Sequence, residues 1–265
     1  MNTPRVIDHI TGWLKEYCER NGQRGFVVGV SGGIDSAVTS ALCARTGLPT
    51  LCVEMPIHQA LNQVARAQDH IAWLRERHSN ARMEVVKLTP VFDALMAALP
   101  THDDKDVMHL ALANARARLR MTTLYYFAGT LRFMVAGTGN KVEDFGIGFF
   151  TKYGDGGVDL SPIADLTKTE VYAVGLDLGI IGSIMTAKPT DGLWGDDRSD
   201  EEQIGASYPE LEWAMDLRAR RLDPDALDLT PRQREVLSIF DRRKAANAHK
   251  MSMPPVCVIP AELKG

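Results

Sequence analysis

The chain has few cysteines, and they are not arranged to build a metal site. Its four cysteines show no CxxC pair and no His/Cys spacing typical of zinc: Cys18, Cys43, Cys52 and Cys257. Two of them lie within apolar runs, an environment in which a free cysteine behaves as a small hydrophobic residue. The sequence therefore predicts buried, reduced thiols rather than metal ligands.

Long hydrophobic runs and an excess of basic residues are also absent. Residues 1–20 contain no apolar core of a signal peptide, and no continuous apolar segment is long enough to span a bilayer. A net charge of -4 argues against a protein that coats nucleic acid. We expect a cytoplasmic enzyme without a membrane or nucleic-acid partner.

Short apolar runs alternate with longer segments of helical periodicity. The expected strands are 26–30, 49–56, 83–88 and 133–138. The expected helices are 34–45, 59–78, 90–99, 107–128 and 168–178. Such alternation predicts an α/β fold, with a doubly wound, mainly parallel sheet that has helices on both faces. With 265 residues, of which 45% are hydrophobic, we expect a single domain over 1–265.

Two irregular segments interrupt this pattern. The first, near 145–160, is rich in glycine, and the second, near 195–206, is acidic. Long loops inside a compact domain are usually functional or mobile. We expect both to be mobile loops, and the first to order over bound substrates and to exclude water from a reactive intermediate.

The stretch VVGVSGGIDSAV, residues 27–38, resembles a phosphate-binding loop between a strand and a helix. Glycines at 29, 32 and 33 let a phosphate approach the backbone, and the amide groups from Ser31 to Ser36 point at it with the positive end of the helix dipole. The loop lacks the lysine of GxxxxGK[ST] and the spacing of GxGxxG. It is therefore neither a Walker loop nor a dinucleotide loop.

An aspartate, Asp35, stands where a phosphate-binding lysine would be expected. A carboxylate beside bound phosphates is tolerable when a metal ion lies between them, so Asp35 is a candidate Mg²⁺ ligand. A simple helix N-cap is the structural alternative. The match over the whole loop, behind a buried strand, favours the phosphate site.

The loop GVSGGIDS resembles that of the N-type ATP pyrophosphatases, which split ATP between its α and β phosphates to activate a substrate as an adenylate. Further segments are similar, in order, to those of the ammonia-dependent NAD synthetases: NARARLRM (114–121), GTGNKVED (137–144), FFTKYGDGGVDLSPIADLTK (149–168), KPTDGLW (188–194), SDEEQIGASY (199–208) and HK (249–250). The resemblance covers nearly the whole chain.

This resemblance implies an activity and the residues for it. The family amidates deamido-NAD with ammonia, using ATP and Mg²⁺, and releases NAD, AMP and pyrophosphate. The positions that match its ATP contacts are Gly29, Ser31, Gly32, Gly33, Asp35, Ser36, Thr138, Lys168 and Thr190. Those that match its deamido-NAD contacts are Arg118, Lys152, Asp159, His249 and Lys250. Asp35 and Glu143 match the metal ligands, and Lys168 and Asp155 are the candidate catalytic residues.

Two assignments stay open at this point. Asp155, in KYGDGG, either accepts a proton from ammonium or simply forms a turn with the glycines that follow it. The segment between Glu143 and Lys152 is one residue longer than the family pattern, so either Glu143 or Asp144 faces the metal. The unchanged spacing from Thr138 favours Glu143.

The resemblance also bears on partners and on rival functions. A chain of this length has no room for a glutaminase domain, so free ammonia or a separate glutaminase would supply the nitrogen. The family is homodimeric, and the apolar surface of helix 107–128 permits a dimer. The alternatives are a GMP-synthetase-like or tRNA-modifying pyrophosphatase, and a nucleotide sensor without turnover. A tRNA-modifying enzyme is expected to have a basic patch, and a sensor to have lost an acid or lysine that this chain keeps.

Overall fold

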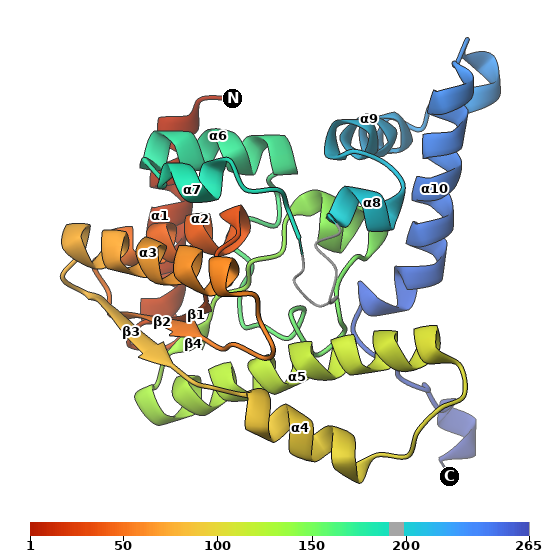
Figure 1. Ribbon diagram of the computed structural model, residues 1–265. Coiled ribbons are helices and arrows are strands. Elements are labelled where there is room, and N and C mark those ends of the chain that lie inside the picture. The colour runs from red at the N-terminus through yellow and green to blue at the C-terminus, as the bar shows by residue number, and fades with distance from the viewer. Residues whose placement is uncertain (191–198, 265) are drawn as a thin grey trace.

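The protein is built on a four-stranded parallel sheet, shown in Figure 1. The computed structural model describes residues 1–190 and 199–264. The strands are β1 (Phe26–Gly29), β2 (Thr50–Glu54), β3 (Ala81–Val85) and β4 (Met134–Val135), in the order β3-β2-β1-β4. Val27 of β1 lies beside Leu51 of β2 and Val135 of β4. The predicted parallel α/β fold is confirmed.

Helices cover both faces of this sheet (Figure 1). On one face lie α1 (Thr3–Arg20), α2 (Ile34–Arg45), α3 (Leu61–Arg77), α6 (Lys168–Leu178) and α7 (Gly182–Met185). On the other lie α4 (Thr89–Ala98) and α5 (Lys105–Leu131). Successive side chains of β1 enter opposite layers, since Val28 packs with α1 and α2 whereas Val27 packs with α4 and α5.

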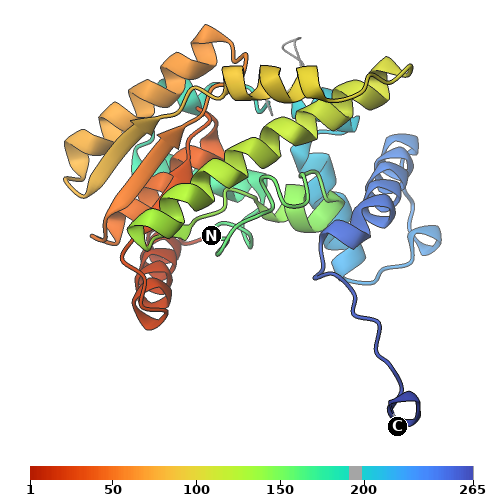
Figure 2. The ribbon, with the colours of Figure 1, turned by 90° about the horizontal axis from the view of Figure 1, so that it is seen from below.

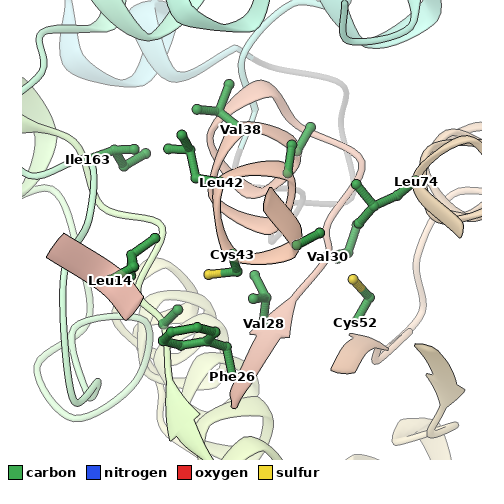
Figure 3. Packing of buried hydrophobic residues seen from close by; sticks show 14 of the residues in the cluster. Leu14, Phe26, Val28, Val30, Val38, Leu42, Cys43, Cys52, Leu74 and Ile163 are labelled. Atoms are coloured by element: carbon green, nitrogen blue, oxygen red, sulfur yellow. The ribbon is translucent and has the colours of Figure 1, made fainter. Parts of the chain in front are cut away.

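Figure 3 shows the first of these layers around β1 and α2. Phe26 and Val28 of the strand lie against Leu42 and Cys43 of the helix, and all four side chains are fully buried. Cys18, Cys43 and Cys52 are buried free thiols, as predicted, whereas Cys257 is exposed. Dense packing of this layer holds the start of α2 rigidly at the end of β1.

A separate hydrophobic cluster forms beside the sheet from the later part of the chain. It joins a π-helix, η1 (Lys141–Ile147), to α9 (Tyr208–Ala219) and α10 (Pro231–Asn247). Short elements complete this region: α8 (Asp200–Ile204), η2 (Pro224–Ala226), η3 (Ala248–Lys250) and η4 (Ala261–Leu263). The C-terminal segment then extends away from the body of the protein (Figure 2). The segment that follows β4 therefore runs from the sheet through η1 into this separate cluster.

Several boundaries differ from the sequence-based expectations. The strand expected at 133–138 contains only Met134 and Val135, because the chain then leaves the sheet toward η1. The loop expected at 195–206 includes α8, which begins with a capping box between Ser199 and Glu202; residues 191–198 lie outside the described residues. The N-terminal helix α1 was not predicted. None of the described helices is long and apolar enough to cross a membrane.

Candidate active site

The predicted phosphate loop joins the carboxyl end of β1 to the first turn of α2. Ser31 and Ser36 hold it closed, since the Ser31 amide donates to Ser36 Oγ at 3.2 Å and Ser36 Oγ donates to the Gly33 carbonyl at 3.0 Å. Gly32 has φ +83°, and a Cβ there would lie 2.8 Å from the Gln63 carbonyl oxygen. A side chain at position 32 would therefore be strained and would collide with α3.

This loop lies along a cavity at the carboxyl ends of the strands. All residues predicted to contact ATP line it: Gly29, Ser31, Gly32, Gly33, Asp35, Ser36, Thr138, Lys168 and Thr190. The strand order reverses between β1 and β4, so the cavity lies at the point where open parallel sheets bind their ligands. The structure thus brings together residues that span positions 29 to 190.

A buried ion-pair network connects three predicted residues inside this cavity. Lys168 Nζ lies 2.5 Å from Asp35 Oδ2 and 2.9 Å from Glu143 Oε1, and only 3% of Lys168 is exposed. Burial lowers the pKa of Lys168, but the two carboxylates raise it by more, so the lysine is fully protonated. Lys168 enters the cavity because Thr167 caps the start of α6 in a capping box with Glu170.

The two carboxylates differ in their environments. Burial raises the pKa of Asp35. Lys168 offsets only part of this rise, and the negative charge of the neighbouring Glu143 raises the pKa further. Burial also acts on Glu143, but Lys168 and a hydrogen bond from Tyr208 outweigh it, so the pKa of Glu143 is lowered. Glu143 is therefore the more firmly ionised of the two.

Two further residues of the network were missed by the sequence analysis. Asn140 is fully buried; its Nδ2 donates to Asp35 Oδ1 at 3.1 Å, while its Oδ1 accepts from the Val142 and Glu143 amides. The Tyr208 hydroxyl donates to Glu143 Oε1 at 2.5 Å, and its ring lies 4.8 Å from Lys168 Nζ. Both residues lie in quoted motifs, but only the fold shows what they contact.

A second pair of carboxylates, Asp144 and Asp155, also lines the cavity. Burial, and then mutual repulsion with the other acids, raises the pKa of Asp144 well above its usual range. Burial likewise raises the pKa of Asp155. Asp155 Oδ1 accepts from the Thr151 amide at 2.8 Å, so this residue both shapes the local turn and borders the cavity.

The segment that contains Glu143 and Asp144 is a π-helix, η1, which has a wider turn than an α-helix. Because successive residues diverge less in such a turn than in an α-helix, the neighbours Glu143 and Asp144 both reach the cavity. Glu143 is the one that contacts Lys168, and Asp144 lies against Gly139, where a Cβ would come within 1.8 Å of its Oδ2. Whether the segment that follows Glu143 carries one residue more than the family pattern stays a prediction.

The acids fit the oxygen-rich environment that Mg²⁺ requires. Within the described part of the chain, no three His, Cys, Asp or Glu side chains converge on a single point. Mg²⁺ commonly needs fewer, because it is held by one or two carboxylates together with substrate phosphates and water. Asp35 and Glu143, placed beside the phosphate loop, satisfy that requirement, and Asp144 offers a further oxygen donor nearby.

The residues predicted to contact deamido-NAD lie apart from this cavity. Four of them gather where the C-terminal segment meets the 150–152 backbone: Arg118, Lys152, His249 and Lys250. Lys152 Nζ donates to the His249 carbonyl and Lys250 Nζ to the Phe150 carbonyl, each at 2.6 Å. The fifth, Asp159, accepts from the Tyr125 hydroxyl and the Val135 amide. The role of all five stays a prediction.

Comparison with known proteins identifies the family. The family model described as NAD synthase matches residues 6–254. The chain is 36% identical over 262 residues to the NH(3)-dependent NAD(+) synthetase of Methanosarcina mazei, covering 97% of this chain and 98% of that one. It is 38% identical over 218 residues to the enzyme of the same description from Carboxydothermus hydrogenoformans, covering 80% and 85%.

Solved structures agree. The structure of NMN synthetase from Francisella tularensis superposes with a TM-score of 0.81 at 29% identity, covering 98% of this chain and 99% of that one. NAD+ synthetase from Burkholderia pseudomallei superposes with a TM-score of 0.70 at 26% identity, covering 96% and 91%. With a matching family model, a near-complete alignment and a shared fold, the chain belongs to the NAD synthase family.

Proposed function

We propose that this chain, a carbon–nitrogen ligase of the NAD synthase family, amidates deamido-NAD with ammonia at the expense of ATP. One observation carries the proposal: the phosphate loop, two buried carboxylates and a buried lysine meet in one cavity. A carboxylate does not react with ammonia unaided. Chemistry that first converts it into an adenylate needs this combination of anion-binding amides and positive charge.

The reaction proceeds in two steps. An oxygen of the nicotinate carboxylate attacks the α-phosphorus of ATP, the bond to the bridging oxygen breaks, and pyrophosphate leaves. Ammonia then attacks the carbonyl carbon of the adenylate, loses a proton, and expels AMP with one of the former carboxylate oxygens. The products are NAD, AMP and pyrophosphate.

Each group of the cavity has a task in the first step. The amides of the 31–36 loop and the dipole of α2 hold the phosphates. Mg²⁺, held by Asp35 and Glu143, would neutralise phosphate charge. Lys168 is a buried cation beside these acids, and it stabilises the charge that develops on the phosphates during attack.

The second step requires a proton acceptor and a dry site. Asp155 borders the cavity, and burial raises its pKa, which makes its carboxylate a stronger proton acceptor than an exposed aspartate. We assign it to hold ammonium and accept its proton. The neighbouring 145–160 segment would shield the adenylate from water by closing over bound substrates.

The dinucleotide is assigned to the group around the C-terminal segment. Arg118, Lys152 and Lys250 supply positive charge there and His249 a further polar group, which suits the pyrophosphate of deamido-NAD. Asp159, which accepts a hydrogen bond from Tyr125, is the fifth residue that we assign to deamido-NAD binding. These basic residues lie close to the backbone at 150–152, next to Asp155, so a dinucleotide held there extends its nicotinate ring toward the cavity.

A homodimer in the cytoplasm is the proposed working form. Apolar side chains remain exposed along α5, among them Val107, Leu110 and Tyr126, and a partner subunit that covered them would remove this apolar surface from water. The three buried free thiols fit a reducing compartment. The ammonia would be free or handed over by a separate glutaminase.

A product assay tests the proposal. Purified protein is incubated with ATP, Mg²⁺, ammonium and deamido-NAD, and the products are separated by chromatography. We expect NAD and AMP in equal amounts, and neither product with the Asp35→Asn variant. A parallel reaction offers nicotinate mononucleotide, the smaller acceptor with the same carboxylate. Efficient amidation of that acceptor alone, or AMP release only with xanthylate or tRNA, would contradict the proposed substrate.

A further inference from the structure

A buried acid on the cavity wall is not used by the mechanism above. Glu54 is the last residue of β2, and it lines the cavity although only 4% of it is exposed. Its Oε2 accepts from Gln68 Nε2 at 3.0 Å. Its Oε1 is also buried, and it has no hydrogen-bond partner among the residues that the structure describes.

The arrangement is costly without a ligand. A buried carboxylate oxygen without a partner loses its hydrogen bonds to water, and no hydrogen bond within the protein replaces them. Arg66, on α3, has the same property, because its Nε is buried and unpartnered within the described chain, and this residue also lines the cavity. Arg66 lies beside the phosphate loop, since a Cβ at Gly32 would lie 3.3 Å from Arg66 Cβ. The unpartnered oxygen of Glu54 therefore indicates, at its own place in the cavity, a ligand group that donates a hydrogen bond.

The position of Glu54 in the sheet identifies that group. Strand β2 is the neighbour of β1 in the sheet. Glu54 is the last residue of β2, and it lies at the same edge of the sheet as Gly29, the last residue of β1, which the phosphate loop follows. A nucleotide whose phosphates occupy the loop can place its sugar over the end of the adjacent strand. In dinucleotide-binding α/β folds an acid binds a ribose hydroxyl, and Glu54 offers the same chemistry beside a different kind of phosphate loop.

The walls on either side suit a nucleoside. A Cβ at Gly29 would lie 3.3 Å from Met55 Cε and 3.4 Å from Leu124 Cδ1, so apolar side chains cover the strand end next to Glu54. Gln63 is buried and also lines the cavity. An apolar wall beside a few convergent polar groups is typical of a small-molecule site.

We propose that Glu54 is the specificity residue for the sugar of ATP: its Oε1 accepts a hydrogen bond from one ribose hydroxyl. The inference rests on the proposed function, since it assumes that ATP occupies the cavity. It adds the prediction that the enzyme distinguishes ribonucleotides from deoxyribonucleotides through Glu54.

Direct binding tests this without turnover. Calorimetry with Mg²⁺ and no acceptor measures the Kd of ATP, 2′-deoxyATP, 3′-deoxyATP and purine riboside triphosphate, which lacks the adenine amino group. For the unaltered chain, we expect one deoxy analogue to bind about tenfold more weakly than ATP, as is typical for a hydrogen bond to a charged group. Glu54→Met should bind ATP and both deoxy analogues within about twofold of each other.

Controls keep the result specific. Glu84→Met makes the same change at an exposed position on β3 and should leave the discrimination intact. If Glu54→Met does not fold, Glu54→Gln keeps the shape with a neutral group and should show a discrimination smaller than that of the unaltered chain.

Three results would overturn the inference. The first is equal binding of ATP and both deoxy analogues by the unaltered chain, and the second is undiminished discrimination in both Glu54 variants. The third is a Glu54-dependent loss of affinity only for the analogue without the amino group, which would place the acid on the base. Failure of the unaltered chain to bind ATP at all would instead overturn the proposed function, and the inference with it.

Discussion

The ammonium group of Lys168 lies 2.5 Å from a carboxylate oxygen of Asp35, 133 positions earlier in the chain. The same group lies 2.9 Å from Glu143. One buried cation therefore balances the two acids to which we assign Mg²⁺. Mg²⁺ bound to Asp35 and Glu143 would neutralise these acids in place of Lys168, which would leave the lysine to face the phosphates of ATP.

Removing this cation should damage both activity and stability. Lys168→Met leaves two buried acids facing each other, and breaking a buried ion pair from one side costs about 3 kcal/mol of unfolding free energy. We expect kcat/KM to fall by at least about 100-fold. Lys141→Met is the matched control, because Lys141 is 40% exposed and pairs with the exposed Asp165, so it should cost less than about 1 kcal/mol. Urea unfolding and steady-state kinetics measure the two effects, and equal losses in both variants would contradict the assignment.

The hydroxyl of Tyr208 links the C-terminal cluster to the site through Glu143. Tyr208→Phe should lower the unfolding free energy by about 1 to 3 kcal/mol. Since this hydrogen bond helps to lower the pKa of Glu143, its loss raises that pKa, and the acidic limb of the kcat/KM profile moves to higher pH. Tyr153→Phe, at a 53% exposed position, is the control. An acidic limb that stays in place would show that the hydroxyl has only a structural role.

The backbone at Gly139 leaves room for the carboxylate of Asp144. An added Cβ would lie 1.8 Å from Asp144 Oδ2, so Gly139→Ala should lower the melting temperature and the activity. Gly12→Ala, where nothing lies within 4 Å, lies inside α1 and should stabilise by about 0.5 to 1 kcal/mol. Adding Asp144→Ala to Gly139→Ala removes the clashing atoms. The double variant should recover the thermal stability, and no recovery would refute the close contact.

Local sequence signals account well for some of this structure. Helices α2 and α6 begin and end at the predicted residues, because a glycine turn starts the first, and a Thr167–Glu170 capping box and a left-handed Gly179 bound the second. Helix α1 carried a readable signal too, in the apolar spacing of Ile7, Ile10 and Leu14.

The contacts within the site were beyond such signals. Asn140 and Tyr208 bond to acids 105 and 65 positions away, and the pattern of neighbouring residues contains no trace of such distant partners. The π-helix was equally hidden, since the sequence analysis expected an irregular segment from about residue 145 and no helix over 141–147. The family resemblance supplied the candidate ATP contacts, and the fold then showed that these residues line one cavity.

A buried histidine outside the site, His70, should make the stability of the protein depend on pH. His70 is fully buried, its Nε2 lies 2.8 Å from Ser40 Oγ, and burial lowers its pKa to about 4. In the unfolded chain this residue becomes protonated near its usual pKa of about 6.5. The contribution of neutral His70 to the free energy of unfolding is therefore fully present above that pH, and it is lost as the pH falls toward 4. We expect a loss of roughly 3 kcal/mol across this window. NMR titration of the ring should show a midpoint near the lower value, and an ordinary midpoint would contradict the burial.

The central claim is that the acceptor carboxylate becomes an adenylate in this cavity. Deamido-NAD with both nicotinate carboxylate oxygens labelled with ¹⁸O tests it, with mass spectrometry of all products after complete turnover with ATP, Mg²⁺ and ammonium. The account predicts one ¹⁸O in AMP, one in the amide of NAD and none in pyrophosphate. Label in free phosphate together with ADP, or AMP without label, would contradict it.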